Sequence, residues 1–337
     1  MQQIGLVIGL WENTRTTDLL RQGKMSEFLA RSCRAFTPFA LLIGLLVGAV
    51  QAQVRPLHTR DLTRLSQVQV GAQLAKSDII FIPVGAVETN GIQPSGRDYV
   101  WPLAYAMAMA EETGGLYMPG LVWSYPGTTT VAPSTVYLSP QAGTAFLKDL
   151  AHSLLKQGFR RQVYLSASHG PAPLTVGTLV REFFEETHVP ILYINMDTYL
   201  PRLQLAADAR SKTMYGAHAM TGRLEDLALA GEYGERESHA AGPLPVNEGL
   251  ATLGRLGFAG SLSLGSWVAD VMAHGGSEVL PKTAAERVAW GQQGEEQVRA
   301  IVKRMQLPEA MKALQQHDRY TREVVVPKFR DRLPAAR

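Results

Sequence analysis

The strongest constraint on the fold is an apolar stretch rich in branched residues, 79–84 (IIFIPV), which predicts a strand buried on both faces. The stretch breaks at Gly85, Glu88 follows almost at once, and a loop containing Gly91, Pro94 and Gly96 leads to Asp98. In open α/β sheets, ligands and catalytic groups collect beyond the carboxyl ends of the strands. Two acids at that edge, joined by a histidine from another strand, would form a metal site of oxygen and imidazole ligands.

The rest of the chain alternates between predicted strands and helices, which indicates a three-layer α/β/α fold with a mostly parallel central sheet. A histidine of the required kind, His169, follows the strand predicted at 161–166. The other predicted strands are 116–122 and 191–195, and the predicted helices are 62–74, 101–113, 141–157, 175–186, 221–229 and 283–305. Ser139 and Pro140 are expected to begin the third of these helices, and Gly158 to end it.

The N-terminal region is typical of a secretory signal peptide. An apolar run, 39–50, follows Arg31 and Arg34, and Val50 and Ala52 fit the small or apolar positions before a cleavage site. We therefore expect cleavage after Ala52, an exported protein and a periplasmic location, with no stable membrane span after processing; an uncleaved anchor is the alternative. Translation could start at Met1 or at Met25. The only cysteine, Cys33, precedes the cleavage site, so the mature chain has no thiol.

Composition places the 337-residue chain among ordinary globular proteins, with 46% hydrophobic and 19% charged residues. Its formal charge of +3 is weak and scattered, which gives no electrostatic case for a nucleic-acid partner. The expected division has four parts: the extension and signal peptide at 1–52, a linker and first helix at 53–77, an α/β domain at 78–310, and a basic tail at 311–337.

The order Glu88, Asp98, His169 and His218 in this frame resembles the creatininase (creatinine amidohydrolase) family. That family shows Gly-x-x-Glu-x-His-Gly after a strand, an Asp at the end of a loop, a Pro-Gly-Thr segment, a Gly-Phe-Arg-Arg motif, a strand ending in Asn-Gly-His, and a late His-Ala-Gly. The matching stretches are Gly85 to Gly91, Gly96-Arg97-Asp98, Pro133-Ser134-Thr135-Val136, Gly158-Phe159-Arg160-Arg161, Ala167-Ser168-His169 and Gly216-Ala217-His218-Ala219.

The resemblance implies a metal-dependent hydrolase of a non-peptide C–N bond in a small, and in some cases cyclic, amide. It implies that Glu88, Asp98 and His169 bind a divalent ion such as Zn²⁺ or Mn²⁺, and that His218 acts as the catalytic acid or base. The family's second ion loses ligands here, because Asn90 stands in place of a histidine and Pro171 brings no ligand. We therefore expect one ion per chain, with Asn90 as a weak second-site ligand. Family members are commonly homo-oligomers, so the resemblance implies the same for this chain.

After His218 the family's Gly-x-x-Glu-Thr-Ser becomes Met220-Thr221-Gly222-Arg223-Leu224-Glu225, so Glu225 matches the family's Glu only with a shift of two residues. Two rival hypotheses remain. The same substitutions would fit a catalytically inactive relative that serves as a periplasmic binding or structural protein. A hydrolase using Ser166 or Ser168 with His169 is weaker, because neither serine lies on a nucleophile elbow.

Overall fold

The computed structural model describes residues 57–120, 134–136, 138–166, 172–204, 209–232, 248–256 and 279–334. The predicted signal peptide and its cleavage site lie outside these residues, as do His169, Ser168 and Pro171. Within the described ranges, no helix is long and apolar enough to cross a membrane.

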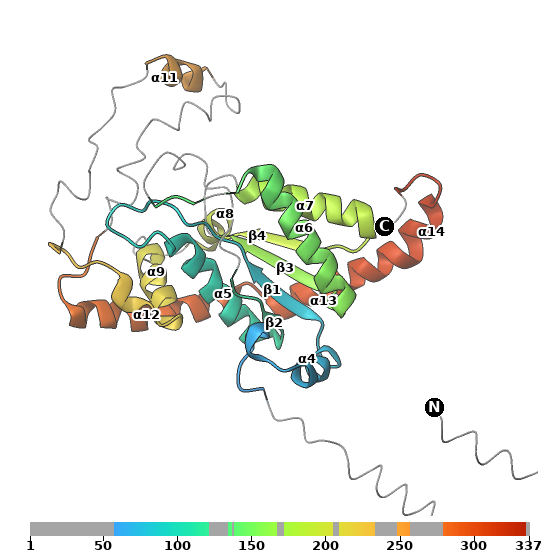
Figure 1. Cartoon of the computed structure of the whole chain (residues 1–337), viewed down its shortest axis with the longest axis horizontal. Helices are drawn as coiled ribbons and strands as arrows, with labels where there is room; N and C mark the ends of the chain where they lie inside the picture. Colours follow the sequence, from blue (N-terminus) through green and yellow to red (C-terminus); the bar gives the residue numbers. More distant parts are fainter. Residues whose placement is uncertain are drawn as a thin grey trace, which may run out of the picture. The chain divides into compact units, whose positions relative to one another are not determined.

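A parallel sheet of four strands, in the order β2-β1-β3-β4, forms the centre of the fold (Figure 1). Its strands are β1 (Ile79–Pro83), β2 (Leu116–Tyr117), β3 (Arg161–Ser166) and β4 (Leu192–Asn195). β1 pairs in parallel with both β2 and β3, and Phe81 lies opposite Val163. All five residues of β1 are buried, as expected for a strand covered on both faces. The predicted α/β/α architecture with a parallel sheet is confirmed.

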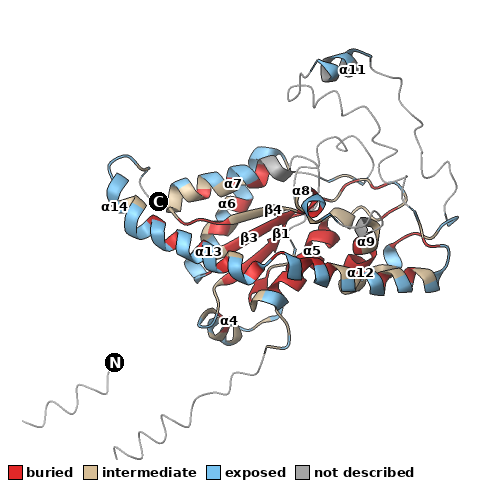
Figure 2. Cartoon of the chain, turned by 180° about the vertical axis from the view of Figure 1, so that it is seen from behind, coloured by how far each residue is buried: buried red, intermediate tan, exposed pale blue. Residues whose placement is uncertain are grey.

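Each face of the sheet builds its own hydrophobic core, because successive strand side chains point to opposite faces. Phe81, Val163 and Leu165 belong to the core formed with helices α5 (Arg97–Thr113), α12 (Ala284–Arg304) and α13 (Leu307–Tyr320). Ile80, Ile82 and Tyr164 belong to the core formed with α6 (Pro140–Gln157) and α7 (Ala172–Thr187). The buried strands lie between these two helical layers (Figure 2).

Local sequence explains several helix ends. The Ser139 side chain accepts a hydrogen bond from the backbone N–H of Ala142 at the start of α6, and Gly158 ends that helix with φ of 107°. Both predictions are therefore confirmed. The remaining described elements are η1 (Leu62–Arg64), α4 (Gln67–Leu74), α8 (Met196–Tyr199), η3 (Leu200–Leu203), α9 (Ala209–Met220), η4 (Leu224–Asp226), α11 (Glu248–Arg255), the π-helical turn η6 (Thr321–Val325) and α14 (Val326–Phe329).

The helix predicted at 221–229 is wrong, and a helix lies on the other side of His218 instead. α9 ends at Met220 because Gly222, at φ of 70°, adopts the left-handed conformation that closes a helix. The N–H of Gly222 donates to the carbonyl of Ala219, and the N–H of Arg223 donates to that of His218. This Schellman-type end places His218 in the last turn of α9. Between 221 and 229, the structure has the short turn η4 in place of the predicted helix.

Other boundaries also differ from expectation. The helix predicted at 62–74 is interrupted at Leu65 and Ser66, because Ser66 caps the start of α4. α5 begins at Arg97 rather than at 101, so Asp98 lies in the first turn of a helix and not at the end of a loop. β2 has two residues instead of seven. The expected domain end at 310 falls inside α13, whose Met311 and Leu314 are buried in the core shared with α5.

The Gly-Phe-Arg-Arg motif has a structural role in this fold. The guanidinium of Arg160 makes two hydrogen bonds to the carboxylate of Asp318 on α13, at 3.2 and 2.8 Å. Arg161 forms an ion pair with Asp78, which precedes β1. The motif thus holds α13 and the start of β1 to the start of β3. This is the amino end of the parallel strands, opposite to the carboxyl end where the acids and His169 are expected.

Candidate metal and catalytic site

Close backbone packing brings Asp98 to the carboxyl end of β1. A Cβ atom on Gly85 would lie 2.4 Å from the Cα of Tyr99 and 2.8 Å from the carbonyl oxygen of Asp98. Only glycine permits this approach, so the chain leaving β1 touches the first turn of α5 directly. A carboxylate in the first turn of a helix is also stabilised by the helix dipole. The fold therefore holds Asp98 beside the loop that carries Glu88.

The loop after β1 is held in place by hydrogen bonds from its own backbone. The N–H of Glu88 donates to the carbonyl of Ser95 at 2.9 Å, and the N–H of Val136 donates to the carbonyl of Val87 at 3.0 Å. The Glu88 side chain is buried, with the residue only 4% exposed. A carboxylate in such a place requires charged or hydrogen-bonding partners, so Glu88 is not a solvated turn residue.

Asn90 is also buried and lies in a turn closed by the N–H of Gln93, which donates to the carbonyl of Asn90 at 3.0 Å. Its side-chain nitrogen donates to the carbonyl of Glu88 at 3.3 Å, so the amide stabilises the loop that presents Glu88. No described residue donates a hydrogen bond to its side-chain oxygen. Asn90 thus has a structural role, and its remaining donor atom is a neutral oxygen, a poor ligand for zinc-like ions.

His218 is completely buried in the last turn of α9. Its Nδ1 lies 3.0 Å from the carbonyl of Met214, so Nδ1 carries the hydrogen and Nε2 carries the lone pair. Nε2 is buried and has no hydrogen-bond partner among the described residues. Burial, with smaller contributions from the charges of Arg97 and Arg223, lowers the pKa of His218 to about 4, against the opposing effects of the Met214 carbonyl and Asp226. The imidazole is therefore neutral at pH 7 and can accept a proton.

Two contacts join the loop after β1 to the segment that follows α9. The N–H of Ala228 donates to the Oε1 of Gln93 at 3.4 Å. The Nη1 of Arg223 lies 3.9 Å from the position that a Cβ on Gly96 would take. Glu88, Asp98 and His218 thus come from elements that meet at one end of the sheet. Among the described residues, which do not include His169, no group of three or more His, Cys, Asp or Glu side chains is placed to hold a metal ion.

Glu225 is used differently from what the shifted alignment suggested. Its carboxylate forms an ion pair with Arg287 of α12, and the same guanidinium donates to the carbonyl of Leu227 at 2.8 Å. Ser166, at the end of β3, shares a 2.6 Å hydrogen bond with the phenol of Tyr193 on β4. Its hydroxyl is therefore held by the neighbouring strand. His169 and Ser168 follow β3 but lie outside the described residues.

Sequence reasoning missed the arginines next to the acids. Arg97 precedes Asp98 directly, and Arg223 occupies the position of the family's Glu in the unshifted alignment. Both were visible as charges beside predicted site residues, but only the structure shows that their charges act on His218. Asp197, the second residue of α8 after β4, is buried. Burial raises the pKa of Tyr193, and the charge of Asp197 adds to this effect.

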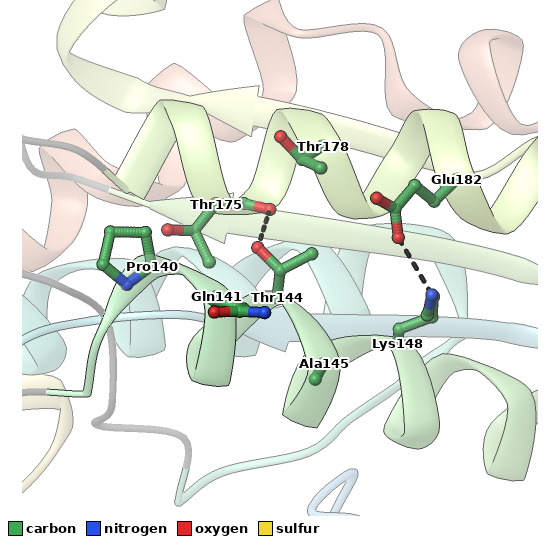
Figure 3. A pocket seen from close by; sticks show the side chains of 8 residues that line it. All are labelled: Pro140, Gln141, Thr144, Ala145, Lys148, Thr175, Thr178 and Glu182. Carbon is green, nitrogen blue, oxygen red and sulfur yellow. Dashed lines mark hydrogen bonds and ion pairs between the residues drawn. The ribbon is translucent and has the colours of Figure 1, made fainter.

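A groove between α6 and α7, of about 490 Å³, is a separate feature of the helical layer (Figure 3). Lys148 spans it with a 2.9 Å ion pair to Glu182, and the hydroxyl of Thr144 donates to the carbonyl of Thr175 at 3.4 Å. Its described lining has no histidine and no second carboxylate, and the charges that it contains are already paired. The groove therefore lacks the donors that hydrolytic chemistry requires.

The carboxyl end of the parallel sheet carries a buried acid, a half-buried acid and a neutral histidine. This arrangement is typical of open α/β proteins, which bind ligands beyond the carboxyl ends of their strands. The sequence model of creatininase (creatinine amidohydrolase) matches residues 63–240, more than half of the 337 residues. The chain belongs to the creatininase family.

Three relatives illustrate the similarity. The chain is 27% identical over 137 residues to the 3-dehydro-scyllo-inosose hydrolase of Thermotoga maritima, covering 40% of this chain and 43% of that protein. It is 30% identical over 112 residues to the creatinine amidohydrolase of Pseudomonas putida, covering 29% and 40%. These matches therefore span about two fifths of each relative. A solved Bacteroides fragilis protein assigned as a creatinine amidohydrolase shares the fold, with 19% identity, a TM-score of 0.50, and coverage of 77% of this chain and 96% of that one.

Proposed function

We propose that this chain is a metal-dependent hydrolase that cleaves a non-peptide C–N bond in a small amide or cyclic amide. Membership of the creatininase family supports the reaction class. The observation that carries the proposal is His218, a fully buried and neutral imidazole whose Nε2 has no described partner. A buried lone pair without a partner costs stability, and such groups are retained where a substrate or reacting proton supplies the partner.

The metal ligands in this proposal are Glu88, Asp98 and His169. Two carboxylates and an imidazole fit a divalent ion such as Zn²⁺ or Mn²⁺, and the buried position of Glu88 suits a cation as its counter-charge. Bound there, the ion would supply Lewis acidity for a carbonyl and lower the pKa of a water molecule. One ion per chain is proposed, because Asn90 holds the loop with its amide and Pro171 provides no ligand.

The protein residues then have separate tasks. His218 accepts a proton at Nε2 and donates it to the leaving nitrogen, while the bond from Nδ1 to Met214 holds the tautomer. Asn90 and the hydrogen bond from Glu88 to Ser95 fix the acidic loop in one geometry. The direct contact of Gly85 with α5 keeps Asp98 beside that loop.

A second candidate substrate comes from the Thermotoga relative, which acts on a 3-dehydro-scyllo-inosose, a carbocyclic ketone and not an amide. The same polarised carbonyl and the same histidine could serve either kind of ring opening. A keto-cyclitol therefore belongs in the substrate panel beside creatinine, hydantoins and lactams. The inactive binding or structural protein remains the alternative from a different functional class.

Metal analysis and hydrolysis assays on the chain from residue 53 onward test the proposal. We expect one tightly bound Mn²⁺ or Zn²⁺ per chain and metal-dependent turnover of at least one panel member. Asp98→Asn should lower kcat/KM by at least about 100-fold and release the metal, because it removes a charged ligand. Asp149→Asn, at an exposed position of α6, is the matched control.

The outcomes separate the claims. Two tightly bound ions per chain would contradict the one-ion proposal while leaving hydrolysis intact. Turnover that survives Asp98→Asn unchanged would contradict the role of Asp98. Metal binding without turnover of any amide or keto-cyclitol would favour the non-catalytic relative. The proposals of export, a periplasmic location and homo-oligomerisation rest on the N-terminal sequence and on family resemblance.

A further inference from the structure

Arg223 is held at a fixed place beside the candidate site. The N–H of Arg223 donates to the carbonyl of His218 at 2.7 Å, and Gly222 supplies the left-handed residue that this helix end requires. The backbone of residue 223 is therefore set by the helix that carries the catalytic histidine. Any movement of α9 would move the arginine and His218 together.

The Arg223 side chain extends toward the acidic loop. Its Nη1 comes within 3.9 Å of the Cβ position on Gly96, two residues before Asp98, and the absence of a side chain on Gly96 leaves that approach open. Its positive charge also contributes to lowering the pKa values of both His218 and Tyr99. Arg97 adds a second positive charge that acts on His218.

Arg223 differs from the neighbouring Arg287 in one respect. Arg287 is buried, donates to the carbonyl of Leu227 and is neutralised by Glu225. Arg223 is exposed and its side chain has no hydrogen bond or ion pair with any described residue. Asp98 and Arg223, which come from segments that meet near Gly96, form no ion pair with each other.

The sequence gives a second, independent reason to expect a particular role for the positive charge of Arg223. In the unshifted match of Met220-Thr221-Gly222-Arg223 to the family's Gly-x-x-Glu, an arginine stands where relatives carry an acid. The local charge at this position is therefore reversed. Guanidinium groups bind carboxylate and phosphate oxygens through paired hydrogen bonds, which an ammonium or an amide cannot reproduce.

We propose that the substrate carries an anionic group, most simply a carboxylate, which Arg223 binds while the scissile carbonyl faces Asp98 and His218. This inference deepens the proposed function and rests on it. Arg97 increases the local positive potential, so that anionic substrates are favoured over neutral ones of the same ring. Neutral creatinine would leave the guanidinium of Arg223 without a partner.

Binding of matched ring pairs tests this directly. Dihydroorotate and dihydrouracil differ by one carboxylate, as do pyroglutamate and 2-pyrrolidinone. We expect calorimetry on the metal-loaded protein to show at least about tenfold tighter binding of the carboxylated member in at least one pair, with the preference falling as salt is added. Arg223→Gln should remove the preference, and Arg223→Lys should restore part of it. Arg181→Gln, on the outer side of α7, is the matched control and should keep it.

Equal binding within both pairs, a preference unchanged in Arg223→Gln, or no binding of any member at millimolar concentration would overturn the inference. Inorganic phosphate competing better than acetate would assign the bound group as a phosphate. Hydrolysis without discrimination between pair members would leave the proposed function standing and the inference rejected. Tighter binding of the carboxylated members without hydrolysis of any panel member would support the anion-binding role of Arg223 and reject the proposed hydrolase function.

Discussion

At the scale of single residues, His218 shows how burial and one hydrogen bond fix the tautomer of an imidazole and keep it neutral. Its Nδ1 is satisfied by the Met214 carbonyl within the same helix, so the tautomer is fixed without a carboxylate partner. The environment of Nε2 is buried and positively charged, which disfavours the imidazolium. The imidazole is thus neutral at pH 7, and protonation of this histidine works against the folded state.

The pH dependence of stability follows from this pKa. The folded-state pKa of His218 is about 4, below the ordinary value of 6.5. Below pH 6.5 the unfolded chain binds a proton that the folded chain does not, so stability is lost as the pH falls from 6.5 toward 4. We expect the histidine to account for about 2–3 kcal/mol of loss in unfolding free energy between pH 7 and 4.5.

Urea unfolding of the wild type and of His218→Gln at both pH values measures this contribution. The variant should be the less stable protein at pH 7, because it replaces a packed imidazole, but it should lose less stability on acidification. His317, in an exposed position on α13, provides the matched control through His317→Gln. Equal acid sensitivity of wild type and His218→Gln would contradict the depressed pKa.

The sequence predicted where Glu88 and Asp98 lie in the fold better than it predicted their surroundings. Their place beyond the carboxyl end of β1 could be predicted because they follow a strand that is apolar throughout, and sheet geometry fixes where strands end. Their role as metal ligands stays a prediction. The structural roles of Asn90 and Glu225 could not be found, because each depends on a partner distant in space or on a backbone turn. The position of Arg223 beside Gly96 likewise results from packing that no local pattern encodes.

At the scale of secondary-structure elements, α9 is positioned by a backbone contact with α12. A Cβ on Gly216 would lie 2.0 Å from the carbonyl carbon of Gly294, and a Cβ on Gly294 would lie 1.9 Å from the carbonyl oxygen of Lys212. The two helices therefore cross with no side chain between them. Because His218 follows Gly216 by two residues, this crossing sets the depth of the imidazole relative to the sheet.

Replacing either glycine should force the helices apart. We expect Gly216→Ala to destabilise the protein by at least about 3 kcal/mol, since the added methyl meets backbone atoms that cannot rotate away. Gly177→Ala on α7 is the control: nothing lies within 4 Å of its added Cβ, and alanine favours a helix by about 0.5–1 kcal/mol. Urea midpoints of the two variants should therefore shift in opposite directions. A Gly216→Ala variant as stable as wild type would contradict the close crossing.

Elements were predictable where their signals were local. The start and end of α6 follow from Ser139, Pro140 and Gly158, and the pattern of β3 gave its exact range. α9 was missed because its sequence has no clear apolar face, and the crossing of two glycines buries it by backbone contact instead. The short β2 shows the same limit, because strand length depends on how far a neighbouring strand runs alongside.

At the scale of the whole molecule, the two ends of the parallel strands have different roles. At the amino ends of β1 and β3, Arg160 binds Asp318 on α13, and Arg161 binds Asp78 before β1. These ion pairs hold α13 and the strands together. The opposite end of the sheet carries Glu88, Asp98 and His218; Glu88 and His218 are buried there, and the Nε2 of His218 has no hydrogen-bond partner among the described residues. The Gly-Phe-Arg-Arg motif therefore holds the fold, whereas the stretches around Glu88 and Asp98 lie at the end of the sheet where we propose the chemistry.

The N-terminal sequence predicts where in the cell the protein is located. Expressed in a bacterium with two membranes, it should be recovered from the periplasm with Gln53 as its first residue, as determined by mass spectrometry and N-terminal sequencing. Ala52→Lys should block cleavage and leave a longer, membrane-retained form, since a long charged side chain does not fit the −1 position.

Gln51→Lys, at the tolerant −2 position, is the control and should be processed normally. A chain beginning at Met25 should be exported equally well, because it keeps Arg31, Arg34 and the whole apolar run. Full-length protein in the cytoplasm would contradict export, and an unprocessed membrane-bound chain would instead support the uncleaved anchor.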